Sequence, residues 1–420
     1  MTGSAKDVQF LKVDISDARA VDAAFMASWP STSFEPGNAE PEITVFHTAA
    51  NIRFYERHPA LLPRSAKVNV DGTQNIISAA LSVGATILVQ TSSGSVAVHS
   101  NRFWLWPWEK RPKYFVQVLN DDDALIPKRH EDFFSNYAAT KHVGEGLVRK
   151  ANGTPSAKGI LKTGCIRPGN GVFGPGKSSF TPLKLEGAQR LMPGGDMLCG
   201  AYLVRKNNPS WIHNMIQNFV YVENCSIAHL CYEERLLELS NGGTNPDISG
   251  QAFTVSDPGA PQTYGDVYSV LETLDGETTF PSLSPTTMLL IAQILELIYL
   301  GRYFLGSSSS RFICTLSRIF PNITGDIVNL QPSLFNLTQL HLIFDDSRAR
   351  LPPEKGGLGY RGPFTTLEGL CKTVEEHQKS GGKGEKRSMS GGVSFGWGQV
   401  RAERAVEKAG ERLGVTQVLN

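Results

Sequence analysis

Hydrophobic and polar positions alternate along the N-terminal half of the chain in short blocks that predict strands and helices in turn. Apolar runs that end in small, hydroxylated or acidic residues are typical of strands, and apolar residues three or four positions apart are typical of amphipathic helices. We therefore expect strands at 8–14, 43–50 and 86–91, and helices at 18–25, 68–81 and around Tyr137. This alternation predicts an α/β fold, a Rossmann-like doubly wound parallel sheet with helices on both faces.

The carboxyl ends of the predicted strands hold the residues of greatest chemical interest. Ligands of a parallel sheet bind beyond that edge. The pattern places Asp14, Ala49, Ala50, Ser93 and Pro168 there. A ligand site is therefore expected at this edge.

A serine, a tyrosine and a lysine supply the candidate chemistry. Ser93 follows the strand 86–91, and Tyr137 and Lys141 lie four residues apart, on one face of a predicted helix. A positive charge on lysine favours the phenolate, so we expect the Tyr137 pKa to fall below its usual value of about 10. This set of groups predicts proton transfer coupled to hydride transfer with a nicotinamide.

The same spacing occurs a second time, at Tyr202 and Lys206. That pair lacks a preceding strand that ends in serines, and it runs into 207–209, where Asn-Asn-Pro would end a helix. We interpret Tyr202 as a chance match. For Tyr137 the alternative is a helix residue that only packs on its neighbours, and the surrounding segments favour catalysis.

Further motifs accompany the Tyr137 helix. They are Val45–Ala50, Val68–Thr73, Thr91–Ser93, Arg167–Pro168, Phe173–Gly176, Phe219–Asn224, His229, Leu358–Tyr360 and Thr366–Gly369. On these motifs the chain resembles the extended short-chain dehydrogenases/reductases. Within that group it is most similar to the 3β-hydroxysteroid dehydrogenases and the sterol-4α-carboxylate 3-dehydrogenases, over roughly residues 8–378.

The resemblance implies catalytic roles for specific residues. Tyr137 becomes the catalytic acid/base and Lys141 its partner, which also binds the nicotinamide ribose. Ser93 would polarise the substrate oxygen, with Ser92 as the alternative if the strand register is shifted by one residue. Asn69 is either a structural or relay residue or a simple helix-start hydrogen bond, and both interpretations stay open.

The resemblance also implies cofactor contacts, to NAD or NADP, with NAD favoured. Ala49 and Ala50 would let the ribose approach the backbone. The remaining contacts are Asp14 and Ile15 at the adenine and Pro168 and Gly169 at the nicotinamide carboxamide.

The family's first strand, its Gly-x-x-Gly-x-x-Gly turn and the following helix have no counterpart in this sequence. That turn seats the cofactor pyrophosphate on a helix N-terminus. We therefore expect weak cofactor binding, and we expect 8–14 and 43–50 to flank a gap. An incomplete copy and a cofactor-deficient relative are both compatible with the sequence, and the retained Ser93, Tyr137 and Lys141 favour the first.

Composition excludes several classes of function. A net charge of +1 gives no electrostatic reason to expect nucleic acid as a partner. The 6 cysteines and 9 histidines show no metal-ligand spacing, so we expect reduced thiols, an intracellular protein and no metal. No apolar leader is expected at the N-terminus.

Three regions depart from a plain Rossmann domain. The aromatic-rich insertion 100–134 is either a lid for an apolar substrate or a self-packed insertion. The apolar segment 286–305 is either a helix at a membrane surface or substrate entrance, or a buried helix. We expect a core at 1–178, a substrate-binding lobe at 179–378 and a flexible tail at 379–420.

These observations lead to three candidate functions. The first is oxidation of a 3β-hydroxyl on a sterol-like substrate, with decarboxylation if a 4α-carboxylate is present. The second is reduction of a polyketide- or flavonoid-like ketone by a related extended reductase, and the third is a non-catalytic lipid-binding or scaffold protein that lacks the cofactor loop. A homodimer, peripheral membrane contact and a place on the cytoplasmic side of the endoplasmic reticulum are left open.

Overall fold

The computed structural model describes residues 8–28, 42–174, 202–203, 206–323 and 325–379, together with 393–395 and 398–399. The chain forms two compact units. The first comprises Met1–Pro281 with Asn336–Gly384, and the second comprises Ser282–Phe335 with Glu385–Asn420. The expected tail at 379–420 lies almost entirely outside the described residues.

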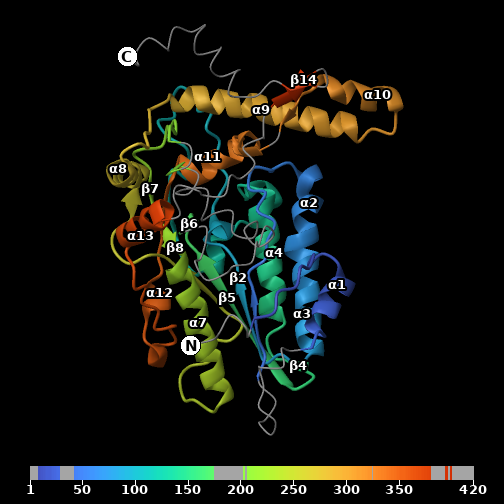
Figure 1. Ribbon diagram of the computed structural model, residues 1–420, viewed down its shortest axis with the longest axis vertical. Helices are drawn as coiled ribbons and strands as arrows, with labels where there is room; N and C mark the ends of the chain where they lie inside the picture. Colours follow the sequence, from blue (N-terminus) through green and yellow to red (C-terminus); the bar gives the residue numbers. More distant parts are fainter. Residues whose placement is uncertain are drawn as a thin grey trace. The chain divides into compact units, whose positions relative to one another are not determined.

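A parallel sheet forms the centre of the first unit (Figure 1). Its strands are β1 (Thr44–His47), β2 (Ile87–Thr91), β5 (Gly159–Pro168) and β9 (Ala252–Val255), in the order β1-β2-β5-β9. The short strand β4 (Thr154–Ser156) pairs antiparallel with the start of β5. The predicted Rossmann-like α/β fold is therefore confirmed.

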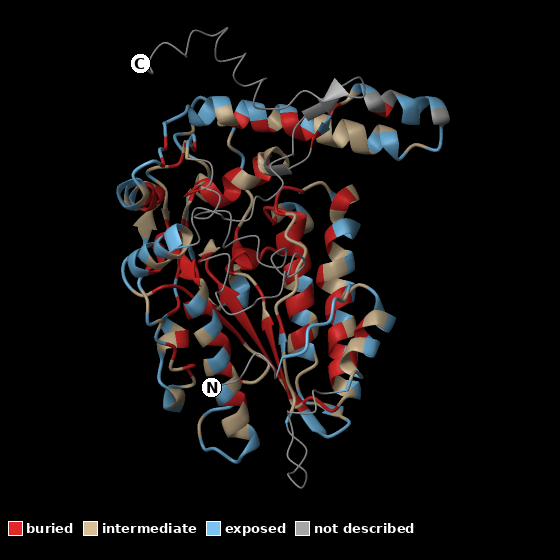
Figure 2. Cartoon of the chain, viewed as in Figure 1, coloured by how far each residue is buried: buried red, intermediate tan, exposed pale blue. Residues whose placement is uncertain are grey.

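Helices cover both faces of this sheet because its strands are apolar on both sides. Leu88 packs with α1 (Ala18–Phe25) and α3 (Thr73–Ser82) in one buried cluster. Its neighbours Ile87 and Val89 pack instead with α7 (Val222–Ser240) in another. Figure 2 shows these strands as the buried interior of the unit. Such two-sided burial explains why β2 is a continuous apolar run.

The strand predicted at 8–14 is not present. These residues form no ladder with any described strand, and Val8, Phe10 and Leu11 are exposed. An apolar run becomes a strand only beside a free sheet edge that can accept its hydrogen bonds. β1 pairs with β2 alone among the described residues, so its other edge is open there and 8–14 does not pair with it.

The helix predicted at 68–81 begins earlier than its apolar pattern indicates. α2 (Leu62–Ala66) leads into a π-helical turn, η3 (Lys67–Gly72), and then into α3. A Cβ on Gly72 would lie 2.8 Å from the Ile15 side chain, so glycine lets the residues after 8–14 pack against this turn. π turns are rare and frequent at functional sites.

The remainder of the first unit surrounds the sheet. α4 (Asn136–Lys150) covers β2 and β5. The other strands are β3 (Val116–Leu119), β6 (Val172–Phe173), β7 (Ile216–Gln217), β8 (Val220–Tyr221), β10 (Gln262–Thr263) and β12 (His341–Phe344). The other helices are α8 (Tyr264–Asp275), α12 (Ser347–Arg350) and α13 (Thr366–Lys379). The short helical turns are η2 (Pro59–Leu61), η4 (Gly94–Ala97), η5 (Asp123–Leu125), η6 (His130–Asp132) and η11 (Pro353–Lys355).

Two smaller strand groups complete this unit. One sheet has the order β10-β7-β12-β3, and β6 pairs with β8. Since β9 comes from beyond residue 178 and completes the central sheet, the expected boundary at 178 does not separate the two compact units.

The second unit contains the apolar segment as a single helix, α9 (Pro285–Gly306). Ser284 caps its first turn, and α10 (Arg311–Leu316) packs back against it. The unit also holds η9 (Ser317–Ile319), β11 (Asn322–Ile323), η10 (Gly325–Asn329), β13 (Val393–Phe395) and β14 (Gly398–Gln399). α11 (Pro332–Thr338) crosses the boundary between the units.

Candidate active site

Two adjacent serines at the end of β2 point to different partners. The Ser93 hydroxyl lies 2.7 Å from the Ser95 hydroxyl, accepts a hydrogen bond from Ser95 N as the cap of η4, and acts to lower the pKa of Tyr137. The Ser92 hydroxyl instead donates to a Glu145 carboxylate oxygen at 2.6 Å. Alternate side chains of an extended segment face opposite ways. Ser93 is therefore the serine on the side of the tyrosine.

α4 presents Tyr137 and Lys141 to the end of β2. The Ser135 hydroxyl caps the helix, and Asn136 fastens its first turn by donating from its backbone N to Glu56 O at 2.8 Å and from its side chain to His58 O at 2.9 Å. Lys141 Nζ donates to the Thr91 carbonyl at 2.6 Å. Both Tyr137 and Lys141 are buried, so one helix face delivers a phenol and an amine into the interior.

Burial dominates the pKa values of both groups. It raises the pKa of Tyr137 to about 12, against an opposing effect of the Ser93 hydrogen bond. It lowers the pKa of Lys141 to about 8, although Cys165 and Glu145 act in the other direction. The expected lowering of the Tyr137 pKa by Lys141 is therefore wrong for this structure, because loss of solvation outweighs it and the amine is bonded to Thr91.

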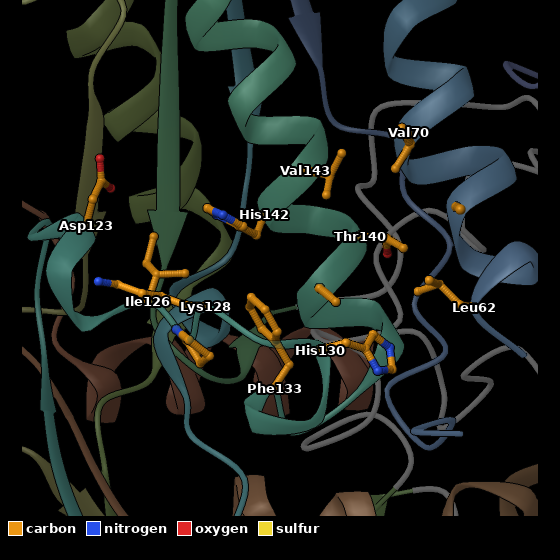
Figure 3. Close-up of a pocket in the computed structure, with 13 residues that line it drawn as sticks. Leu62, Val70, Asp123, Ile126, Lys128, His130, Phe133, Thr140, His142 and Val143 are labelled. Atoms are coloured by element: carbon orange, nitrogen blue, oxygen red, sulfur yellow. The ribbon is translucent and has the colours of Figure 1, made fainter. Parts of the chain in front are cut away.

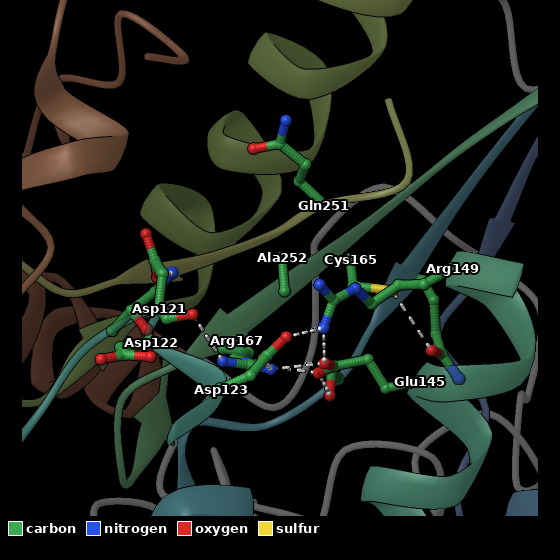
Figure 4. A network of polar contacts seen from close by, with 12 residues as sticks. Asp121, Asp122, Asp123, Glu145, Arg149, Cys165, Arg167, Gln251 and Ala252 are labelled. Atoms are coloured by element: carbon green, nitrogen blue, oxygen red, sulfur yellow. Dashed lines mark hydrogen bonds and ion pairs between the residues drawn. The ribbon is translucent and has the colours of Figure 1, made fainter. Parts of the chain in front are cut away.

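A buried ion network lies behind these residues (Figure 4). Arg167, on β5, donates to both Glu145 carboxylate oxygens, at 2.5 and 2.9 Å, and to Asp123 at 2.8 Å. Arg149 also bonds Asp123, at 2.7 Å. Burial by itself would raise the pKa of Glu145, but the Arg167 guanidinium holds it below its usual value.

Glu145 was not among the residues expected from the sequence. It lies four positions after Lys141 and eight after Tyr137, on the same side of α4. It links α4 to Ser92 on the β2 side and to Arg167 on β5. The helical spacing of Glu145 from Tyr137 and Lys141 could be read from the sequence. Its partner Arg167 could be identified only from the tertiary structure.

Asn69 ties the segment after β1 to α4. Its side chain accepts from Asn51 N at 2.7 Å and donates to Asn51 O at 3.1 Å and to Thr140 Oγ1 at 3.0 Å. It lies inside the π turn η3, and the helix has already begun at Leu62. A simple helix-start hydrogen bond is therefore not its role.

The expected cofactor residues fall in two places. Ala49 and Ala50 follow β1, and Pro168 and Gly169 are the last residue of β5 and the one after it; these two strands flank β2. A Cβ on Gly169 would lie 3.3 Å from Asn218 O, so a larger residue there would need the neighbouring backbone to shift slightly.

Asp14 and Ile15 lie elsewhere, beside the long helix of α2, η3 and α3. The Asp14 carboxylate accepts from Ser16 N and Oγ at 2.9 and 2.8 Å, and these bonds lower its pKa. Ile15 O accepts from the Asn75 side chain at 2.9 Å.

His229 also reaches the β2 end, from α7. Its Nε2 lies 2.7 Å from Thr91 Oγ1, and its Nδ1 lies 2.8 Å from Cys225 O. Within the described ranges, no group of three or more His, Cys, Asp or Glu side chains is arranged to hold a metal ion.

A pocket of about 630 Å³ opens on a different side of α4 (Figure 3). Ala139, His142 and Val143 line it together with Val70 of η3 and Phe133. Tyr137 and Lys141 do not line it. The pocket is therefore separate from the face that carries the candidate chemistry.

The second Tyr-Lys pair forms no comparable site. The Tyr202 ring packs edge-on against Tyr268 and Phe280, at 5.9 and 5.1 Å. Lys206 lies outside the helix with φ 63° and is paired with Asp275 at 2.9 Å. The interpretation of Tyr202 as a chance match agrees with these contacts.

The chain matches the 3-beta hydroxysteroid dehydrogenase/isomerase family over residues 38–280. It is 28% identical to the 3beta-hydroxysteroid-dehydrogenase/decarboxylase isoform 2 of Arabidopsis thaliana, covering 91% of this chain and 55% of the relative. It is 31% identical to a decarboxylating sterol-4-alpha-carboxylate 3-dehydrogenase of Candida albicans, covering 45% of this chain and 43% of the relative.

The chain thus spans little more than half the length of the Arabidopsis relative. Among solved structures, the fold is similar to the UDP-glucose 4-epimerase of Thermotoga maritima, with a TM-score of 0.50 and 17% identity over 90% of this chain and 88% of that one. At this identity the likeness concerns the fold alone.

Proposed function

Because the chain belongs to the 3-beta hydroxysteroid dehydrogenase/isomerase family, we propose that it oxidises a 3β-hydroxyl on a sterol-like ring system to a ketone, with NAD or NADP. The half-buried Ser93 and the buried Tyr137 and Lys141, which meet at the end of β2, carry this proposal. The names of the plant and fungal relatives support a sterol as the substrate class.

The three side chains divide the chemistry between them. The Ser93 hydroxyl donates a hydrogen bond to the substrate oxygen, and the Tyr137 phenolate takes the hydroxyl proton during oxidation. Since burial alone raises the pKa of Tyr137 to about 12, a nearby ammonium is needed to stabilise the phenolate. We assign that role to Lys141, which lies one helical turn further along the same face of α4 and donates to the Thr91 carbonyl in this structure. The nicotinamide, when bound, supplies the hydride acceptor.

A 4α-carboxylate on the substrate would extend the reaction. Oxidation of the neighbouring 3β-hydroxyl yields a β-keto acid, which loses carbon dioxide without a dedicated protein base. The decarboxylating names of the Arabidopsis and Candida relatives favour this version. Ser93 would then stabilise the enolate oxygen that forms as the carboxylate leaves.

The described residues fit one half of the cofactor better than the other. Lys141 would hold the nicotinamide ribose, and Pro168 and Gly169 would lie beside the carboxamide. For the pyrophosphate, the described glycines before β2 are Gly72 and Gly84, and neither follows a strand. A glycine-rich turn that opens a helix is the usual anion site. We therefore propose that this chain contacts the nicotinamide end of the cofactor specifically and the pyrophosphate only loosely.

Product analysis tests the proposed reaction. The purified chain is incubated with a 3β-hydroxysterol, with and without a 4α-carboxylate, at saturating NAD⁺ or NADP⁺. We expect a 3-ketone, and from the carboxylated substrate also carbon dioxide. If no ketone forms with either cofactor while the sterol binds to the chain, the activity is refuted and the non-catalytic lipid-binding alternative is correct.

We also propose that α9 contacts a membrane peripherally, on the cytoplasmic side of the endoplasmic reticulum, and admits the sterol from the bilayer. α9 is the one described helix long and apolar enough to cross a membrane, with 22% of its apolar window buried. Its exposed surface includes Leu290, Ile294 and Leu297. Gln293, Glu296 and Arg302 interrupt the apolar sequence and favour a surface position over a span.

Replacing Leu290, Ile294 and Leu297 by serine tests this position. We expect the variant to move to the soluble fraction and to keep its activity on detergent-dispersed sterol, because the three side chains are solvent-exposed in the folded chain. A misfolded variant would show that they belong to a protein core. Wild type that resists carbonate extraction would show a true span.

A further inference from the structure

Three tryptophans lie exposed on one short loop, which we call the Trp loop (residues 102–113). Trp104, Trp106 and Trp108 are 47%, 56% and 75% exposed. The rings of Trp106 and Trp108 stack in parallel, with centroids 5.4 Å apart and planes within 5°. Large aromatic side chains gain much free energy from burial, so a group of them in solvent marks an interaction surface.

The loop is built to hold this arrangement. Arg102 donates to both Glu109 carboxylate oxygens at 2.7 Å, and Glu109 accepts from Trp106 N at 2.7 Å. The Arg102 guanidinium also lies over the Trp106 ring, 5.6 Å from its centroid. These contacts close the loop on itself and leave the tryptophans outside.

A second set of contacts fixes the base of the loop. The Asn101 side chain accepts from Tyr114 N at 2.9 Å and donates to Tyr114 O at 3.3 Å, so the two ends of the loop are joined. Asn101 N donates to the Asn336 side chain at 2.7 Å. The exposed tryptophans therefore stand on a closed loop that is anchored to the first unit.

Charge accompanies the aromatic rings. The loop carries four basic residues and one acidic residue, whereas the whole chain has a net charge of only +1. Arg102 is neutralised by Glu109, but Lys110, Arg111 and Lys113 are exposed. The Lys113 ammonium lies 4.8 Å from the Tyr114 ring centroid, still at the surface.

We propose that the Trp loop docks on the surface of an anionic phospholipid bilayer, with its indoles at the level of the headgroups. Tryptophan favours that layer because it combines an apolar ring with a polar N–H. Basic residues beside it attract acidic lipids. This contact is independent of α9, which lies in the other compact unit, and it does not depend on the proposed reaction.

A lid over the substrate is the competing interpretation of the same loop. A lid places its aromatic rings against the site it closes, whereas these three rings face solvent. A strand of single-stranded nucleic acid could also stack on tryptophan, but it needs a basic track along its backbone. Three exposed cations on one tight loop match a headgroup layer better than an extended polyanion.

Vesicle binding by the full chain tests the proposal. Sedimentation with phosphatidylcholine vesicles, with and without phosphatidylserine, is compared for wild type and for W104S/W106S/W108S. The matched control is I160S/L230S/L367S, which removes three equally exposed apolar side chains elsewhere in the first unit. All comparisons are repeated in the background L290S/I294S/L297S, so that α9 does not mask the effect.

We expect the tryptophan variant to bind phosphatidylserine vesicles at least about tenfold more weakly, and the control to bind as wild type does. K110Q/R111Q should lose about 30-fold in affinity for the acidic vesicles at low salt and nothing for neutral ones. Bromine-labelled lipid should quench wild-type tryptophan fluorescence, and this measurement needs no variant to fold.

Absence of quenching, or equal binding by the tryptophan variant and wild type, would overturn the proposal. So would a raised KM for detergent-dispersed sterol with unchanged vesicle binding, which identifies a lid. Equally tight binding to oligothymidine and to acidic vesicles would identify a nucleic-acid surface instead.

Discussion

Two segments of this chain place a tyrosine four residues before a lysine, and the two pairs have opposite environments in the fold. Tyr137 and Lys141 share one face of a continuous helix and are buried at the end of β2. Tyr202 packs in an aromatic cluster, and Lys206 has left the helix and pairs with Asp275.

The difference shows that a tyrosine four residues before a lysine does not by itself indicate a catalytic site. What distinguishes the first pair is its surroundings: a hydroxyl from the neighbouring strand at Ser93 and a buried carboxylate at Glu145. The position four residues after Lys206 holds Ser210 instead. Each of these features can be removed separately, and the second pair then serves as the control.

The largest effect is expected from the tyrosines themselves. Tyr137→Phe removes the proton-handling group and should lower turnover by about 10²–10⁴-fold. Tyr202→Phe removes a hydroxyl from an aromatic cluster and should leave turnover near wild type. Steady-state rates of sterol oxidation measure both. Near-normal turnover of Tyr137→Phe, or loss of turnover in Tyr202→Phe, would contradict the assignment.

Measuring cofactor affinity tests whether the cofactor-binding site beside Tyr137 and Lys141 is complete. Without a glycine-rich turn on a helix N-terminus, we expect this chain to bind NAD(H) and NADP(H) with a Kd near about 1 mM, a loss of several kcal/mol relative to micromolar binding. Fluorescence of the reduced nicotinamide follows the titration. A micromolar Kd would show that other residues replace the turn.

Replacing Glu145 tests whether its buried carboxylate stabilises the structure around Tyr137 and Lys141. Glu145→Ala leaves the Arg167 guanidinium buried, with the half-exposed Asp123 as its remaining carboxylate partner. We expect the free energy of unfolding to fall by about 3–5 kcal/mol. Ser210→Ala, at the equivalent position of the second pair, should change it by less than about 1 kcal/mol. Urea denaturation measures both, and similar losses would contradict the distinction.

The pH dependence of stability separates the two lysines. Folded Lys141 loses its proton near pH 8, whereas its ordinary pKa is 10.5. Between these values the unfolded chain binds more protons, so this group makes the free energy of unfolding rise with pH, by up to about 1.4 kcal/mol per pH unit. Below pH 8 both states are protonated and the contribution is flat.

Lys141→Met should remove that rise. The Asp275 carboxylate raises the pKa of Lys206 against the effect of burial, so the contribution of Lys206 changes only above its ordinary pKa. Lys206→Met should therefore retain the rise between pH 8 and 10. Urea denaturation curves at several pH values give the difference between each variant and wild type. Parallel curves for wild type and Lys141→Met would contradict the burial of a titrating amine.

Much of the secondary structure in both units followed from the sequence because its signals are local. The apolar runs of β1 and β2, the spacing on α4 and the long apolar helix α9 depend on residues close together in the chain. Local periodicity also separated the two Tyr-Lys pairs, since the Asn-Asn-Pro at 207–209 argues against a helix there. These features need no knowledge of distant neighbours.

Tertiary structure decided the properties that depend on a partner from elsewhere. The run at 8–14 has the composition of a strand but no described edge beside it, and Asn69 bonds Asn51 and Thr140 from within a π turn. Glu145 meets Arg167 only when α4 packs on β5. Which of the two serines faces Tyr137 also depended on how β2 ends against α4.

The direction of the Tyr137 pKa shift shows most clearly what the sequence determined and what the tertiary structure decided. The sequence determined that a phenol and an amine share one helix face, and from charge alone it predicted a lowered pKa. The tertiary structure buries both groups and bonds the amine to Thr91, so the pKa is raised. Side-chain spacing is set by the helix, but solvation is set by everything packed around it.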